Sequence, residues 1–275
     1  MQGRLCEKVD GKIQAFPWRD WETEFPAAAA IGVHLMEWTL DQERLYENPL
    51  MNGEGQVRIR SLCQRHDVAI PSLTGDCFMQ APFWKVDGAA SVALQGDFIA
   101  ICRACASVGV LMIVVPLVDN GRLESTEQET SLVEYLLGHE SLFASLGLQI
   151  IFESDYVPQE LKRFISLLPE DRFGINYDIG NSAALGFDPA EEFAAYGERI
   201  VNVHVKDRML GGTTVPLTSG SADFGTVFAE LGRLGYSGNF ILQTARAAND
   251  DHADVLGRYR DMTLQWMKQN GLAVG

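Results

Sequence analysis

The sequence predicts a single (β/α)8 barrel that spans residues 1–275. Short apolar runs alternate with longer amphipathic runs eight times, and alternation of strands with helices is typical of a parallel sheet because each crossover needs a helix. Some runs, such as residues 110–116, are apolar on both faces, which indicates a sheet covered on both sides. No G-x-G-x-x-G motif follows an expected strand, so an open dinucleotide-binding sheet lacks its main signature.

The expected strands are short runs bounded by polar or glycine-containing segments. They cover residues 1–5, 33–39, 68–74, 110–116, 148–154, 173–178, 200–206 and 239–244. The first run begins at Met1 itself. We therefore expect a short first strand, or a natural N-terminus that lies upstream of Met1.

The expected helices lie between these strands. They cover residues 18–31, 55–66, 91–108, 126–146, 158–168, 189–196, 222–234 and 253–268. Pro189 follows Asp188, so a proline takes the first helical position behind a capping residue. Eight strand–helix pairs in 275 residues fit a closed barrel, for which about 250 residues are typical.

Composition narrows the classes of function. The formal net charge of −15 makes nucleic acid a poor partner, because such a chain repels phosphate backbones. The longest apolar run, residues 108–118, is too short to span a bilayer, and we expect no membrane association. The N-terminus has no basic region ahead of an apolar one. We expect a cytoplasmic protein.

The five cysteines have no framework spacing, which favours a reducing compartment. Cys102 and Cys105 form a C-x-x-C pair inside an expected helix. We interpret them as two small apolar residues that pack in the core. A redox or zinc role is the alternative.

Four consecutive late strands end in polar residues: Glu153, Asp178, His204 and Gln243. In such a barrel the chemistry lies at the carboxyl ends of the strands, where inward-pointing side chains converge. Oxygen, oxygen, nitrogen and oxygen donors suit one divalent metal ion, with Mn²⁺ favoured and Mg²⁺, Co²⁺ or Zn²⁺ as alternatives. Each residue could instead merely cap its strand, but four at corresponding positions favour a site.

Several motifs resemble those of the xylose isomerase-like TIM barrels, a superfamily of sugar isomerases and 3-epimerases. They are "GRL" at 3–5, "IFES" around Glu153, "NYDIGN" at 176–181 and "VHVKDR" at 203–208. The resemblance implies a divalent metal held by Glu153, Asp178, His204 and the residue at position 243. Many relatives have glutamate at that fourth position and histidine at the position of Asn181, so this chain departs from the pattern twice.

The resemblance implies proton abstraction next to a carbonyl through a metal-stabilised cis-enediolate. Glu153 is then the candidate catalytic base. In the epimerases a second glutamate serves the opposite face of the carbon, and the amide of Gln243 cannot do so. We therefore favour 1,2-isomerisation, which needs one base, over 3-epimerisation. Glu37, Asp76 or Asp207 could supply a second acid, although Glu37 could equally be a buried residue paired with an arginine.

The candidate substrate-binding residues follow the late strands. Loops after the last two strands of such barrels often hold phosphate, and residues 209–225 form a long glycine- and serine-rich loop of this kind. We expect a sugar or a sugar phosphate as the small-molecule partner and leave the two open. Lys12 could reach an anionic substrate. The candidates are Asn181, Lys206, Asp207, Arg208, Ser219, Ser221, Glu37 and Arg246.

Three other functions compete. An endonuclease IV-like enzyme would need more histidine ligands and a basic surface, which this chain lacks. A polyol dehydratase of the same superfamily would share the first chemical step. A non-catalytic sugar-binding relative with a degraded site would account for Gln243 and Asn181. The oligomeric state is open, with a homo-oligomer as one alternative.

Overall fold

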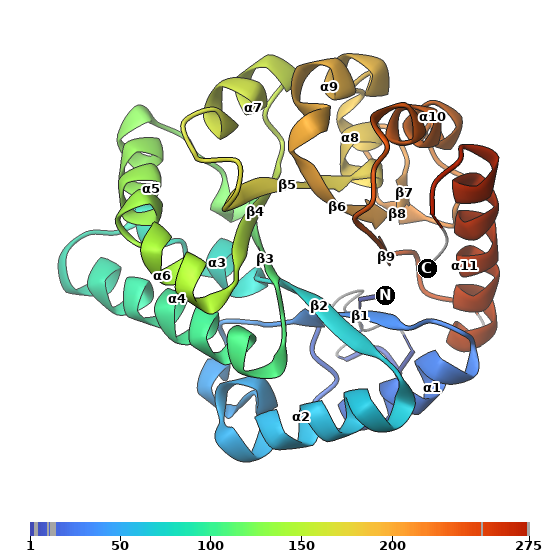
Figure 1. Cartoon of the computed structure of the whole chain (residues 1–275), viewed down its shortest axis with the longest axis horizontal. Coiled ribbons are helices and arrows are strands. Elements are labelled where there is room, and N and C mark those ends of the chain that lie inside the picture. The colour runs from blue at the N-terminus through green and yellow to red at the C-terminus, as the bar shows by residue number, and fades with distance from the viewer. Residues whose placement is uncertain (3–4, 10, 12–14, 249, 274–275) are drawn as a thin grey trace.

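A seven-stranded parallel sheet curls into a nearly closed barrel at the centre of the molecule (Figure 1). The computed structural model describes residues 1–2, 5–9, 11, 15–248 and 250–273. The predicted TIM-barrel fold class is confirmed, because each neighbouring pair of strands in this sheet is parallel. The strands, in sheet order, are β1 (Leu35–Thr39), β2 (Ala69–Thr74), β3 (Met112–Leu117), β4 (Gln149–Ser154), β5 (Phe173–Asp178), β6 (Ile200–Val205) and β9 (Asn239–Leu242).

Two residues take the place of the expected first strand. Gln2 forms an isolated parallel bridge with Glu37. The Gln2 backbone N–H donates to the Leu242 carbonyl at 3.1 Å, and the Glu37 N–H donates to the Met1 carbonyl at 2.7 Å. Met1 and Gln2 therefore join β9 to β1 and form the seam of the barrel. Residues 3 and 4 of the predicted strand lie outside the described residues.

Helices surround the barrel as an outer ring (Figure 1). They are α1 (Glu24–Ala30), α2 (Gly53–His66), α3 (Asp76–Gln80), α4 (Gly88–Val108), α5 (Thr126–Gly138), α6 (Glu140–Leu146), α7 (Pro158–Ile165), α8 (Ile179–Leu185), α9 (Pro189–Tyr196), α10 (Phe224–Leu234) and α11 (His252–Gln269). Short 3-10 turns cover Trp21–Thr23, Leu45–Glu47, Pro49–Met51, Phe83–Lys85, Asp119–Gly121 and Gly197–Arg199. A two-stranded hairpin, β7 (Asp207–Arg208) with β8 (Thr214–Val215), follows β6.

The helical predictions need correction at several places, and helix α3 was not expected. The single helix expected over 126–146 is divided into α5 and α6 at Gly138 and His139, because glycine is a poor helix former. The short helix α8 was not expected at all. It begins at the end of β5, where the Asp178 carboxylate accepts a hydrogen bond of 2.8 Å from the Asn181 N–H and caps the helix.

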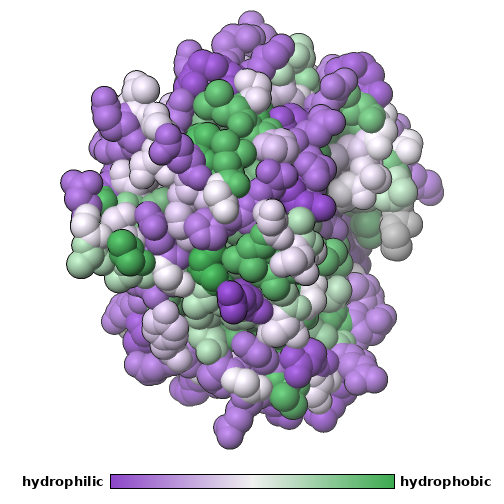
Figure 2. Space-filling model, turned by 60° about the vertical axis from the view of Figure 1, so that its left-hand side comes forward, coloured by the Kyte–Doolittle hydropathy of each residue, from purple (hydrophilic) through white to green (hydrophobic). Residues whose placement is uncertain are grey.

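Helix α4 is long and apolar enough in composition to cross a membrane. Here it packs on the barrel through Phe98, Ile101, Cys102 and Cys105, which are buried. Both cysteines are free thiols, in agreement with the packing role expected for them. The side of the molecule that carries α4 and α5 comes forward in Figure 2, where hydrophilic side chains separate small hydrophobic patches.

Candidate metal centre and active-site cavity

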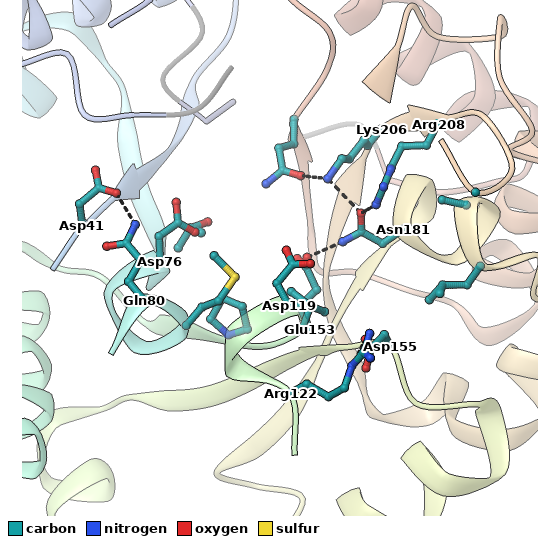
Figure 3. A pocket seen from close by; sticks show the side chains of 18 residues that line it. Asp41, Asp76, Gln80, Asp119, Arg122, Glu153, Asp155, Asn181, Lys206 and Arg208 are labelled. Carbon is teal, nitrogen blue, oxygen red and sulfur yellow. Dashed lines mark hydrogen bonds and ion pairs between the residues drawn. The ribbon is translucent and has the colours of Figure 1, made fainter. Parts of the chain in front are cut away.

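A cavity of about 560 Å³ opens at the carboxyl ends of the strands. Among the predicted site residues it is lined by Glu153, Asn181, Lys206, Arg208 and Gln243. Figure 3 shows Glu153 at the centre of this wall, with Asn181, Lys206 and Arg208 on one side of it and Asp41 and Asp76 on the other. The sequence therefore predicted much of one wall of the cavity.

Glu153, Asp178 and His204 converge beneath the cavity. They come from β4, β5 and β6, and Asp178 lies beside His204 in the register of the sheet. The Nδ1 atom of His204 lies 3.2 Å from Glu153 Oε2 and 3.8 Å from Asp178 Oδ2. One ligand atom from each of the three buried residues lies within 4.8 Å of the others.

Glu37 lies behind His204 rather than on the cavity wall. Its Oε1 atom is 2.8 Å from His204 Nε2, and its other oxygen accepts a hydrogen bond of 2.7 Å from Ser72. The Thr74 hydroxyl also donates to Glu37. The predicted substrate contact of Glu37 therefore needs correction. It is a fully buried residue with a basic partner, and that partner is a histidine instead of an arginine. The pairing leaves Nδ1 of His204 facing Glu153.

The charges of the cluster shift the pKa values of its members. Burial by itself would lower the pKa of His204, but the Glu37 charge and the hydrogen bonds of Asp178 and Glu153 raise that pKa well above its usual value. Burial would raise the pKa of Asp178, but the Lys206 ammonium and His204 outweigh burial and hold it below the usual range. Buried carboxylates thus outnumber nearby cations, which is the imbalance that a bound divalent cation offsets.

Gln243 is linked to the same cluster by the Lys206 ammonium group. The Lys206 ammonium donates to Gln243 Oε1 at 2.9 Å, to Asp178 Oδ2 at 3.1 Å and to Asn181 Oδ1 at 3.1 Å. The oxygens of Asp178 and Gln243 therefore converge on one position, and a positive charge lies there. A metal ion that used both oxygens would have to share them with Lys206 or displace it.

The donor set fits a divalent cation. Neighbouring ligand atoms of an octahedral ion with bonds of about 2.1 Å lie about 3 Å apart. The 3.2 Å separation between His204 Nδ1 and Glu153 is close to this spacing, whereas the 3.8 Å separation to Asp178 is longer. Glu153, Asp178 and His204 would hold the ion, with Gln243 as a fourth ligand. When bound, such an ion acts as a Lewis acid toward a carbonyl oxygen.

Two asparagines fix the Glu153 carboxylate. Asn181 Nδ2 donates to Glu153 Oε1 at 2.6 Å, and Asn176 Nδ2 donates to Oε2 at 3.0 Å. Asn181 also accepts a hydrogen bond of 2.8 Å from Arg208 Nη1. The sequence singled out Asn181 but left Asn176 out of the site, although residues two apart on a strand share a face and Asn176 stands two before Asp178.

The loop after β6 differs from its prediction. Asp207 is fully buried, and its two oxygens accept from the Gly220 N–H at 2.8 Å and the Ala222 N–H at 3.1 Å. The Ser221 hydroxyl accepts from the Leu210 N–H at 3.0 Å. Asp207, Ser219 and Ser221 do not line the cavity, because the loop folds back on the Asp207 side chain. Their predicted contact with substrate is corrected accordingly.

Two further predictions, for Arg246 and Lys12, concern residues away from this loop. The guanidinium of Arg246 donates to the Cys6 carbonyl and does not line the cavity, which corrects its predicted role. Trp38 and Trp84 are buried, and their indole N–H groups donate to Asn48 and to the Gly121 carbonyl. Both rings therefore serve the core. Lys12 lies outside the described residues.

The cavity is also lined by acids that the sequence mostly missed. Asp41, Asp76 and Asp119 line it, after β1, β2 and β3 respectively, and only Asp76 was considered beforehand. Their position just past a strand end was the available signal, because loops at that edge of a barrel form the site.

A family model described as the xylose isomerase-like TIM barrel matches residues 25–262. The chain belongs to the xylose isomerase-like TIM-barrel family. This membership agrees with the resemblance drawn from the strand-end motifs.

Several known proteins are similar to this chain. L-ribulose-5-phosphate 3-epimerase UlaE of Salmonella paratyphi C is 34% identical over 101 residues, which is 36% of each chain. The putative L-ribulose-5-phosphate 3-epimerase SgbU of Haemophilus influenzae is 23% identical over 92% of this chain and 93% of its own. The solved structure of the IOLI protein with a bound zinc atom shares the fold, with a TM-score of 0.73, 16% identity and coverage of 92% and 94%.

Proposed function

We propose that this protein is a divalent-metal-dependent sugar isomerase or epimerase that moves a proton at a carbon next to a carbonyl. The observation that supports this proposal most strongly is that Glu153 lines the cavity and also belongs to a buried cluster with Asp178 and His204. A carboxylate in that position can take a proton from a substrate in the cavity. The epimerases named above support the reaction class, and the zinc-containing structure supports a divalent metal, for which we favour Mn²⁺.

The residues of this chain divide the work. Glu153 is the base, and Asn181 and Asn176 hold its two oxygens in place. Glu37 orients the His204 ring, so that Nδ1 faces the acids. Lys206 and Arg208 reach the cavity from the next strand and its hairpin, where they can donate to substrate oxygens. We expect the enzyme to act in the cytoplasm.

We infer that 1,2-isomerisation is favoured over 3-epimerisation. Gln243 has no acidic proton to exchange near neutral pH, and one base on one face is enough for isomerisation. Of the three acids suggested as a second base, Glu37 and Asp207 are buried away from the cavity. Asp76 lines it from the opposite wall. Asp76 is therefore the remaining candidate for proton transfer on the second face.

A substrate panel tests both proposals. Purified protein is loaded with Mn²⁺ and incubated with aldoses, ketoses and their phosphates, and the products are separated by chromatography. We expect aldose–ketose interconversion that depends on metal, and new 3-epimerisation in Gln243→Glu. Full-rate 3-epimerisation by the wild type would overturn the preference for isomerisation, and its loss in Asp76→Asn would then assign the second base.

Two alternatives have their own signatures in the same experiment. Loss of water from a cyclic polyol would identify a dehydratase. Sugar binding without turnover in the metal-loaded protein would identify a non-catalytic relative. Lys206, whose ammonium lies between Asp178 and Gln243, is the feature that keeps the second alternative open.

A further inference from the structure

The loop between β6 and α10 folds around the carboxylate of Asp207. Barrels of this type often bind phosphate at this point, on backbone N–H groups and a helix N-terminus. Here the Asp207 carboxylate accepts from the N–H groups of Gly220 and Ala222, at 2.8 and 3.1 Å. A Cβ added at Gly220 would lie 2.2 Å from Asp207 Oδ1 and 2.6 Å from the Arg208 carbonyl. The loop is therefore packed around a carboxylate and has no room for a phosphate.

The N-terminus of α10 is satisfied in the same way. Asp223 accepts from the Thr226 N–H at 3.0 Å and from the Thr226 hydroxyl at 2.7 Å. Two carboxylates of the chain thus take the donors and the positive end of the helix dipole that a bound phosphate would use. Phosphate recognition at this place would require one of them to leave.

The cavity itself is acidic. Five carboxylates and three cationic side chains line it, which gives a formal charge of 3 − 5 = −2 before any metal is bound. Figure 3 shows that the acids reach around the cavity from Asp41 to Asp155. A bound divalent metal would bring this formal charge to zero, so the cavity offers a phosphate dianion no net attraction, whereas its carboxylates accept hydrogen bonds from sugar hydroxyls. The carboxylates are Asp41, Asp76, Asp119, Glu153 and Asp155.

The cations of the cavity already have partners. Arg122 Nε donates to Asp155 Oδ2 at 2.7 Å, and Lys206 forms an ion pair of 3.1 Å with Asp178. Arg208 forms no ion pair among the described residues, but its Nε and Nη2 donate to the Gly212 carbonyl at 3.1 and 2.7 Å, and its Nη1 donates to Asn181. Arg208 is the group through which a phosphate could still be recognised, so it belongs in the test.

We propose that the site takes an unphosphorylated sugar, with hydroxyls that donate to Asp41, Asp76 and Asp119. The inference rests on the proposed function. It separates this chain from the ribulose-5-phosphate epimerases to which it is similar. The determinants of the choice are Asp207, which fills the loop, and the acids Asp41, Asp76 and Asp119 that line the cavity.

The test compares each free sugar with its own phosphate ester in the full-length, Mn²⁺-loaded protein. We expect kcat/KM to be at least tenfold higher for the free sugar that is turned over. Asp119→Asn and Asp76→Asn should shift this ratio several-fold toward the phosphate, because each removes one repelling charge. Asp171→Asn is the matched control: Asp171 is an exposed carboxylate outside the cavity, and its loss should leave the ratio unchanged.

Preference for the phosphate, with its loss in Arg208→Met, would overturn the inference while it leaves the proposed reaction intact. Absence of any turnover would instead contradict the proposed reaction. In that case calorimetric titration of the same protein with each sugar and its phosphate decides the inference. Tighter binding of the free sugar supports it, and tighter binding of the phosphate overturns it.

Discussion

Asp178 and Asp207 follow neighbouring strands of the barrel, and their surroundings differ sharply. Asp178 ends β5 and is held largely by side chains, those of His204 and Lys206, in addition to one capping N–H group. Asp207 comes after β6 and is held by two backbone N–H groups of a loop. Side-chain partners can rearrange when a cation or substrate arrives. Backbone partners belong to the fold and cannot move without it.

This difference distinguishes a carboxylate of the candidate active site, Asp178, from a carboxylate that stabilises the fold, Asp207. The cluster of Glu153, Asp178 and His204 opens onto the cavity through Glu153 and carries excess negative charge. In the loop after β6, the Asp207 carboxylate is buried and accepts hydrogen bonds from the N–H groups of the loop itself. Carboxylates at the same edge of a barrel can therefore serve either the active site or the stability of the fold. Side-chain donors indicate the first role, and backbone N–H donors indicate the second.

The largest effect is expected for Glu153→Gln, on the site side of the comparison. Loss of a general base reduces kcat/KM by roughly 10²- to 10⁴-fold. Steady-state sugar interconversion measures this change, with circular dichroism as the control for folding. A loss of less than tenfold in a folded, metal-loaded variant would mean that another group is the base.

Asp207→Ala should act mainly on stability. It removes the acceptor of two partly buried N–H groups, those of Gly220 and Ala222, at about 1–3 kcal/mol for each group left unsatisfied. We expect the unfolding free energy to fall by about 3 kcal/mol, measured by thermal and urea denaturation, with the exposed Asp171→Ala as control. An unchanged melting temperature together with lost activity would contradict a stabilising role for Asp207 and would assign it to the active site.

Glu37→Gln tests whether the buried pair behind His204 serves the metal. Outer partners of a ligating histidine commonly contribute 10- to 100-fold in metal affinity. We expect Mn²⁺ or Zn²⁺ binding to weaken by about this factor in equilibrium dialysis. Glu192→Gln is a useful comparison, because Glu192 is also buried but accepts from Tyr177 and Tyr196 hydroxyls away from the cluster. Equal metal affinities in the two variants would contradict the role of Glu37.

The smallest effect is expected for Asp223→Asn, which tests a second carboxylate that stabilises the fold. Hydrogen bonds from Thr226 lower the pKa of Asp223. Stability from this group is therefore present above the ordinary pKa of an aspartate and is lost as the pH falls through the lowered value. Asparagine also caps helices, so we expect less than about 1 kcal/mol of change at pH 7. Urea unfolding between pH 7 and 3 should show a weaker acid dependence in the variant than in the wild type.

The sequence predicted the barrel because seven strands carry their own signal of periodicity and turn residues. It predicted Glu153, Asp178, His204 and Gln243 because each ends such a strand. It could not predict which hydrogen-bond partners each of these polar side chains has. Whether Asp207 faces substrate or the Gly220 N–H depends on how the 209–225 loop folds, and loop conformation leaves little trace in periodicity. The acids Asp41 and Asp119 escaped notice for a related reason, because they lie in loops with no repeating pattern.

The seam between β9 and β1 bears on how the chain folds. The bond from the Gln2 N–H to the Leu242 carbonyl joins residues 240 positions apart, whereas each helical crossover joins strands that are near neighbours in sequence. Contacts of such high contact order form slowly, because a long loop must close before they contribute. The early strands can pair as they emerge from the ribosome, but closure must wait for β9, the last strand of the barrel to be synthesised. Until then β1 remains an open edge, which makes this half-built barrel the species most prone to aggregate.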